Sequence, residues 1–286
     1  MIHFRKHGQC VEPIADYLRN PLGRAVVPWN LHPRGLRSFG PIPSADLRPF
    51  ISAIGDQSQI GACTAYGTKD GMATSMARAG IAAGAYFAAL PLYRGTRCIE
   101  RASAYPSGGL PRLTDSGACP DDVLKVATTF GIQSSDDECG EAGPSEALSQ
   151  FENEHVNDEP TLLEFEHDST FKIVGAFDIV STGQTRIDDV RRAHEAGFSV
   201  GISVHASDDR YQNYLGGVMP DPPAGAGCNH WNYLAGNYID ATGTPIFFGV
   251  NSWSKKWGEA GLWRGGPGII HAADCLIVYS VSKVQP

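Results

Sequence analysis

A change in local sequence pattern near residue 171 most constrains what this chain can fold into. Before it, alanine-rich stretches predict helices. After it, short apolar runs bounded by glycine and proline predict strands. A helix-rich part followed by a strand-rich part, with no internal repeat, predicts an α+β fold of two lobes with a cleft between them. We expect a helical lobe over about 47–170 and a β-rich lobe over about 171–286.

The expected elements follow from periodicity and from capping residues. Helices are expected over 63–78, 121–130, 145–154 and 187–196, and the apolar stretch 79–92 is interpreted as buried helix. Residues 94–116 are expected to be rich in loops because prolines and glycines recur there. Strands are expected over 171–180, 198–205, 229–239, 245–253, 261–264 and 275–281.

Residues 1–46 are interpreted as an N-terminal arm. Prolines interrupt every helical period there, so the arm either wraps over the body or stays loose. Residues 1–48 carry seven Lys and Arg against three acids, and residues 133–169 carry twelve acids without a Lys or Arg. No secretory signal peptide is recognised at the N-terminus. We therefore expect synthesis in the cytoplasm, which leaves release by a non-classical route open.

Composition excludes several classes of function. The net charge of −8 argues against nonspecific nucleic-acid binding. Seven cysteines at irregular spacing form neither a disulfide framework nor a zinc motif. The stretch 79–92 is short for a membrane span. We expect a monomer with no metal, no cofactor and no membrane segment.

Cys63 lies in a setting that favours reactivity. Gly61 supplies a bend just before it and a predicted helix begins at it, so free N–H groups at the helix N-terminus favour a thiolate. Gln57, six positions earlier, is placed to act as an oxyanion donor. Most lone cysteines are packing residues, so the nucleophile hypothesis requires a histidine elsewhere in the chain.

The strand-rich part supplies that histidine. His230 begins one predicted strand, and Asn251 ends the next, 21 positions later. Across an antiparallel pair the two become neighbours, and the asparagine can orient the imidazole. Trp253 lies two residues further along, on the same face, where it can shield this hydrogen bond from water.

Taken in order, Gln57, Gly61, Cys63, His230 and then Asn251-Ser252-Trp253 with Trp257-Gly258-Glu259 resemble the papain family of cysteine proteases. The resemblance covers about 46–286 and is closer to divergent bacterial and viral members. It implies a papain-like fold whose helical lobe carries the nucleophile. The β-rich lobe, a barrel-like antiparallel sheet, would carry the histidine and asparagine.

The resemblance also implies roles for individual residues. Cys63 would be the nucleophile with a lowered thiol pKa, His230 the general base, and Asn251 the residue that orients it. Gln57 and the Cys63 N–H would form the oxyanion hole. The substrate, an extended polypeptide, would bind Gly117 and Ala118.

Four positions depart from the family pattern. Ile60 replaces a cysteine that forms a disulfide in secreted members, and Thr64 replaces an aromatic residue. Asn229 stands where many members have Asp, which we expect to narrow the active pH range. Trp231 stands where a small residue usually lines the second substrate pocket.

The large Trp231 indole is expected to shrink that pocket, so small or flat side chains would be preferred there. Ile202, Ser203 and Cys228 are expected to supply other walls, and Trp253 is counted among the substrate-binding residues. The remaining histidines, including His194, His205 and His271, are interpreted as surface or packing residues.

The first functional hypothesis is a cysteine endopeptidase that works through an acyl-enzyme and is restrained by residues 1–40 lying in its cleft. A disordered tail or a partner-docking arm is the alternative for that segment. A Cys–His acyltransferase or amidase of the transglutaminase kind is the second hypothesis. A noncatalytic binding protein with a papain fold is the third.

Overall fold

In the described part of the chain, the helical lobe is built from four helices. The computed structural model describes residues 27–28, 42–81, 84–105, 109–133, 145–160 and 171–283. The four helices are α2 (Cys63–Arg78), α3 (Leu90–Ala104), α4 (Pro120–Thr129) and α6 (Glu146–His155). Ser145 caps α6 by accepting a hydrogen bond from the backbone of Leu148 at 3.0 Å.

Among the described residues, the β-rich lobe is a nine-stranded sheet with the order β1-β3-β9-β4-β6-β7-β8-β5, and β2 pairs with β6. Most pairs are antiparallel, and the short pairs β1–β3 and β5–β8 at the two ends are parallel. The strands are β1 (Val27–Pro28), β2 (Ala45–Asp46), β3 (Phe171–Asp178), β4 (Val200–Val204), β5 (Val218–Met219), β6 (His230–Ile239), β7 (Pro245–Val250), β8 (Leu262–Gly265) and β9 (Leu276–Lys283).

The longer helix α8 (Gly183–Glu195) and three short elements border this sheet: the 3-10 turn η2 (Arg48–Phe50), α9 (Asp209–Gln212) and α10 (Pro267–Ala272). One apolar core lies between the sheet, α8 and α10, and a second lies among α2, α3 and α4. The architecture is therefore α+β with two lobes, as the sequence predicts.

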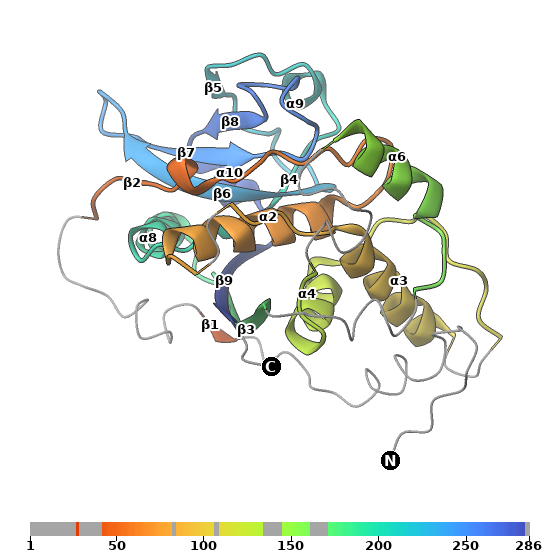
Figure 1. Ribbon diagram of the computed structural model, residues 1–286. Helices are drawn as coiled ribbons and strands as arrows, with labels where there is room; N and C mark the ends of the chain where they lie inside the picture. Colours follow the sequence, from red (N-terminus) through yellow and green to blue (C-terminus); the bar gives the residue numbers. More distant parts are fainter. Residues whose placement is uncertain are drawn as a thin grey trace.

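Helix α2 joins the two lobes by crossing the sheet beside β6 (Figure 1). Glycine makes this approach close. A Cβ on Gly67 would lie 2.8 Å from Cδ1 of Trp231 on β6, and one on Gly71 would lie 3.2 Å from Oγ of Ser199. Because the first residue of α2 is Cys63, the helix carries that thiol to the junction between the lobes.

The structure confirms most of the expected elements and corrects one region. Residues 84–89 are not helical. The helix α3 instead begins at Leu90, has Pro91 in its first turn, and continues through residues expected to be loop. It buries Leu92, Tyr93 and Ile99 in the helical-lobe core. Basic side chains within α3 obscured this apolar face in the sequence.

Two short parts of the predicted arm are described. Val27–Pro28 pairs with β3, and Ala45–Asp46 pairs with β6. The prediction that residues 1–40 lie in the cleft otherwise falls outside the described residues. Most of the predicted acidic connection, at 134–144 and 161–170, also falls outside them.

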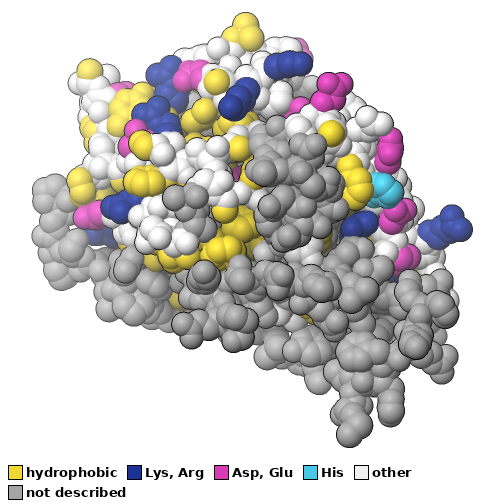
Figure 2. Space-filling view, in the orientation of Figure 1, with side chains coloured by type: hydrophobic (Ala, Val, Ile, Leu, Met, Phe, Trp, Pro, Cys, Tyr) yellow, Lys and Arg dark blue, Asp and Glu magenta, His cyan; other side chains and the backbone are white. Residues whose placement is uncertain are grey.

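Acidic and basic side chains are interspersed over the described surface that faces the viewer in Figure 2. None of the described helices has the length and apolar character that a membrane crossing requires. The described cysteines are free thiols: Cys63, Cys98, Cys119, Cys228 and Cys275.

Candidate active site

Cys63 is the first residue of α2 and is half-buried. The backbones of Trp231 and Thr64 act on its thiol and oppose the rise in pKa that burial causes. Thr64 belongs to the first turn of α2, whereas Trp231 follows His230 on β6. The thiol therefore lies where the N-terminus of α2 meets the strand that carries the histidine.

His230 and Asn251 are brought together by the antiparallel pair β6–β7, in which Tyr233 lies opposite Val250. The His230 Nε2 and Asn251 Oδ1 atoms are 2.7 Å apart. Both side chains are buried. The expected neighbourhood of the two residues across the strand pair is present.

The neighbours of Asn251 determine which imidazole nitrogen carries the proton. The backbone N–H of Ser252 lies 2.8 Å from Asn251 Oδ1, and a backbone N–H can only donate. That atom is therefore the amide oxygen, and His230 Nε2 must donate to it. The neutral ring consequently has an unprotonated Nδ1, the nitrogen that can accept a thiol proton.

Aromatic rings enclose this hydrogen bond. The Trp253 ring lies 4.9 Å from the His230 ring between centroids, and the Tyr211 ring lies edge-on to His230 at 5.9 Å. Tyr211 also contacts the rings of Trp253 and Trp257. Trp253 thus lies over the imidazole, as expected for a shield against water.

Gln57 is held at both ends of its amide. Its Nε2 donates to the carbonyl oxygen of Ile60 at 2.7 Å, and its Oε1 accepts from the Ser252 hydroxyl at 2.6 Å. The Ile60 carbonyl can only accept, so the orientation of the amide is fixed. One N–H of Nε2 remains for a further acceptor, and the side chain is only 7% exposed.

Burial is the largest influence on the pKa values of Cys63 and His230. It raises the pKa of the Cys63 thiol, although the backbone hydrogen bonds from Trp231 and Thr64 oppose that rise. It lowers the pKa of His230 to about 4, partly offset by the hydrogen bond to Asn251. The prediction of a lowered thiol pKa is therefore wrong, because desolvation outweighs the helix N-terminus.

The segment 115–118 is tied to the residues before Cys63. The Asp115 carboxylate accepts from the backbone N–H of Gly61 at 2.9 Å and from the Tyr93 hydroxyl at 2.5 Å. The Tyr93 oxygen in turn accepts from the N–H of Gly117 at 2.9 Å. Gly117 has a φ of +81°, which favours glycine. Ala118, next along, packs against the helical-lobe core.

Two predicted pocket residues are core residues instead. The Trp231 side chain is 2% exposed and lies between α2 and the sheet, and Ile202 is fully buried in the β-rich lobe. Successive side chains on a strand face opposite sides, so Trp231 points away from the face that carries His230. Neither side chain presents a surface to substrate, and the expected effect of Trp231 on the second pocket loses its basis.

Of the remaining predicted residues, Cys228 and Asn229 lie near the surface and His194 is buried. The Cys228 thiol is half-buried, and its sulfur lies 3.5 Å from the carbonyl oxygen of Ala272. Asn229 is exposed and holds the segment after β4, accepting from the N–H of Ala206 at 2.8 Å. His194 is buried, as a packing residue, and burial lowers its pKa to about 3.

The sequence interpretation missed Asn232 and the role of Tyr211. Asn232 is fully buried and donates from Nδ2 to Asn251 Oδ1 at 3.2 Å. Period-two alternation from His230 was the available signal, because a polar residue on the same strand face has to find a partner when buried. Among the described residues no group of metal-ligating side chains is gathered.

Comparisons with known proteins agree with this geometry. Residues 115–282 match the family model described as papain family cysteine protease. That range contains His230 and Asn251 and begins after Cys63 and Gln57. No curated protein sequence matches the chain.

Solved structures match over most of the chain. Digestive procathepsin L 3 from the larval midgut of Tenebrio molitor has a TM-score of 0.61 at 21% identity, covering 85% of this chain and 71% of that one. Bromelain from Ananas comosus, in complex with the E64 inhibitor, has a TM-score of 0.59 at 16% identity, covering 86% and 100%. At these identities the likeness concerns the fold.

Proposed function

The chain belongs to the papain family of cysteine proteases, and we propose that it hydrolyses internal peptide bonds of polypeptides with Cys63 as its nucleophile. In this proposal His230 is the general base and Asn251 is the residue that orients it. Gln57 and the backbone N–H of Cys63 form the oxyanion hole. The substrate backbone lies along Gly117 and Ala118.

Acylation begins with transfer of the thiol proton from Cys63 to Nδ1 of His230. The thiolate sulfur attacks the carbonyl carbon of the scissile bond, and the carbonyl oxygen becomes an oxyanion that the free N–H of Gln57 Nε2 can stabilise. When the tetrahedral intermediate collapses, His230 returns the proton to the leaving nitrogen. The products of this step are a free amine and a thioester on Cys63.

Deacylation repeats these steps with water. His230 takes a proton from water, the hydroxide attacks the thioester, and the thiol reforms as the acid product leaves. Because burial disfavours the charged forms of Cys63 and His230, we propose that the proton moves as the substrate arrives. The substrate carbonyl then supplies the acceptor for the new negative charge.

One observation carries this proposal: the buried hydrogen bond from His230 Nε2 to Asn251 Oδ1, 2.7 Å long. It leaves Nδ1 as the basic nitrogen of the ring. The backbone of the next residue, Trp231, acts on the pKa of the Cys63 thiol, which supports placing base and nucleophile in one site.

Hydrolysis of an internally quenched peptide library tests the proposal. We expect cleavage by the parent protein and loss of at least about 10³-fold in kcat/KM in Cys63→Ala and His230→Ala. The exposed Cys119 supplies a matched control, and Cys119→Ser should retain full activity. Transfer of the acyl group to an added amine without hydrolysis would instead support an acyltransferase. Absence of both reactions would support a binding protein.

We also propose that residues 1–40 restrain the activity. The basic character of this segment and the surplus of acids at 133–169 support attraction between the arm and the body. Two truncations test it, one removing 1–26 and keeping the β1 pair, the other removing 1–40. A several-fold rise in kcat/KM on a small peptide is expected. An unchanged kcat/KM in both truncations would contradict restraint.

Two further parts of the proposal concern partners. We propose that the chain acts as a monomer and binds polypeptide rather than nucleic acid. The net charge of −8 supports the second point. Light scattering at micromolar concentration is expected to give the mass of one chain, and a dimer mass would contradict the first point.

A further inference from the structure

Asn251 Oδ1 accepts three hydrogen bonds, and only one of them comes from the histidine. The donors are His230 Nε2 at 2.7 Å, the backbone N–H of Ser252 at 2.8 Å and Asn232 Nδ2 at 3.2 Å. The Asn251 Nδ2 atom is buried without a hydrogen-bond partner among the described residues. The donors around Oδ1 therefore hold this amide in place from one side only.

The orientation of the Asn232 amide is itself fixed by the donors to its Oδ1 atom. Its Oδ1 accepts from the Trp263 indole Nε1 at 2.8 Å and from the Tyr211 hydroxyl. An indole N–H can only donate, so this atom must be the Asn232 oxygen. The Asn232 Nδ2 is thereby directed at the Trp231 carbonyl oxygen, at 2.9 Å, and at Asn251 Oδ1.

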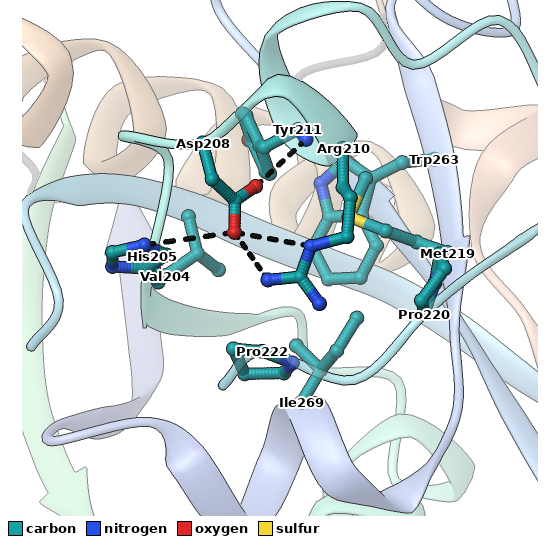
Figure 3. Close-up of a pocket in the computed structure, with 10 residues that line it drawn as sticks. All are labelled: Val204, His205, Asp208, Arg210, Tyr211, Met219, Pro220, Pro222, Trp263 and Ile269. Atoms are coloured by element: carbon teal, nitrogen blue, oxygen red, sulfur yellow. Dashed lines mark hydrogen bonds and ion pairs between the residues drawn. The ribbon is translucent and has the colours of Figure 1, made fainter. Parts of the chain in front are cut away.

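Both donors belong to buried side chains. Trp263 is fully buried on β8, and Tyr211 belongs to the single-turn helix α9. Figure 3 shows Tyr211 and Trp263 beside the same pocket, where the Asp208 carboxylate caps α9. Asp208 accepts from the Tyr211 backbone N–H at 3.2 Å and pairs with the Arg210 guanidinium.

We propose that Asn232 is a positioning residue, which holds the Asn251 carbonyl oxygen toward His230 and so keeps the proton on Nε2 and the base on Nδ1. The orientation passes from Trp263 and Tyr211 to Asn232, then to Asn251, and then to the imidazole. Asn232 touches neither substrate nor thiol in this scheme. The kinetic part of the proposal rests on the proposed peptidase function.

A polar residue with this burial requires a reason. Asn232 is 0% exposed on a strand whose neighbouring positions are packed with apolar and aromatic side chains. A leucine of similar size would fill the space without a polar group. Packing alone therefore does not call for an asparagine, whereas fixing the Asn251 amide does.

The test compares Asn232→Leu with Asn237→Leu. Asn237 lies on the same strand and is equally buried, but it bonds His194 at 3.1 Å, away from the site. Asn232→Leu should lower kcat about 10-fold with KM unchanged, because a misoriented base weakens the chemical step and not binding. Asn237→Leu should leave kcat at the parent value.

A spectroscopic readout tests the positioning without requiring activity. In the Cys63→Ser protein, ¹⁵N NMR of labelled histidine should show His230 protonated on Nε2, and Asn232→Leu in that background should give a mixture of Nε2–H and Nδ1–H tautomers. Failure of the parent to cleave peptides would overturn the proposed function and leave this tautomer measurement valid.

A second variant guards against misfolding. Asn232→Asp keeps oxygen atoms for Trp263 and Tyr211, and above the pKa of its buried carboxyl, which burial raises, it has no proton to donate to Asn251. Circular dichroism should show a folded protein, and the tautomer mixture should appear here too. If either folded variant keeps His230 entirely as the Nε2–H tautomer, or keeps the parent kcat, Asn232 does not position the base.

Discussion

At the scale of single residues, Gln57 offers the most direct prediction. Its amide is fixed by the Ile60 carbonyl and the Ser252 hydroxyl, which leaves one N–H for the oxyanion. Gln57→Ala should reduce kcat by about 10²- to 10³-fold, as expected for the loss of one oxyanion donor. Steady-state kinetics on one peptide measures it. The exposed Gln59 provides the control, and equal kcat values for Gln57→Ala and Gln59→Ala would contradict the assignment.

Trp231 gives a prediction about stability. Its indole is buried against Gly67 and Gly201, so Trp231→Ala should lower the free energy of unfolding by about 3–5 kcal/mol. Urea unfolding measures the change. Leu215→Ala, at a site 90% exposed, should change it by less than about 0.5 kcal/mol. If Trp231→Ala lowers the free energy of unfolding by less than about 1 kcal/mol, the indole is not a core residue, and the pocket-wall prediction stands again.

Residue-level inference from the sequence succeeded where chemistry restricts the residue type. The spacing of His230 and Asn251 on adjacent strands was predictable because an antiparallel pair makes them neighbours. The pocket role of Trp231 was not predictable from the family pattern, because that pattern gives only the position of the residue along the chain. The direction of its side chain follows instead from the alternation of faces along the strand. The structure settles the direction in favour of the core.

At the scale of elements, α6 is tied to α2 by one buried pair. The Tyr66 hydroxyl donates to the Glu152 carboxylate, and burial raises the pKa of Glu152 to about 7. A carboxyl with a raised pKa contributes stability that is fully present below its unfolded pKa of about 4.5 and is lost as pH rises through about 7.

Glu152→Gln should remove this loss of stability with rising pH, because glutamine does not titrate. Between pH 5 and pH 8 the parent should lose on the order of 2 kcal/mol of unfolding free energy that Glu152→Gln retains. Urea unfolding at both pH values measures the difference. Glu154→Gln, on the exposed face of the same helix, should follow the parent. Identical pH dependence in all three proteins would exclude Glu152 as the cause.

Helices with clear ends were predictable from sequence, and α3 was not. Pro120 in the first turn and Gly131 after the end marked α4, as expected from capping preferences. In α3 the side chains of Arg94 and Arg97 are buried, so charge did not mark the exposed face. Tertiary contacts, such as that between Arg97 and the Val156 carbonyl, determine which face of α3 is buried.

At the scale of the whole molecule, the two lobes meet through α2 and β6. The order of helical and strand-rich segments predicted this division, since each part had its own periodicity. The described parts of 1–46 add two short strands to the sheet, which local pattern could not predict because two-residue strands carry no period. The proposed function depends on the junction, because Cys63 comes from one lobe and His230 from the other.

Site-mapped labelling tests that junction most directly. A peptidyl epoxide, which alkylates an activated thiol, should modify the parent protein once, and peptide mass spectrometry should find the adduct on Cys63. His230→Ala should abolish the labelling while the exposed Cys119 remains free for iodoacetamide. An adduct on another cysteine, or undiminished labelling of Cys63 in His230→Ala, would contradict the claim that these two residues form the catalytic pair.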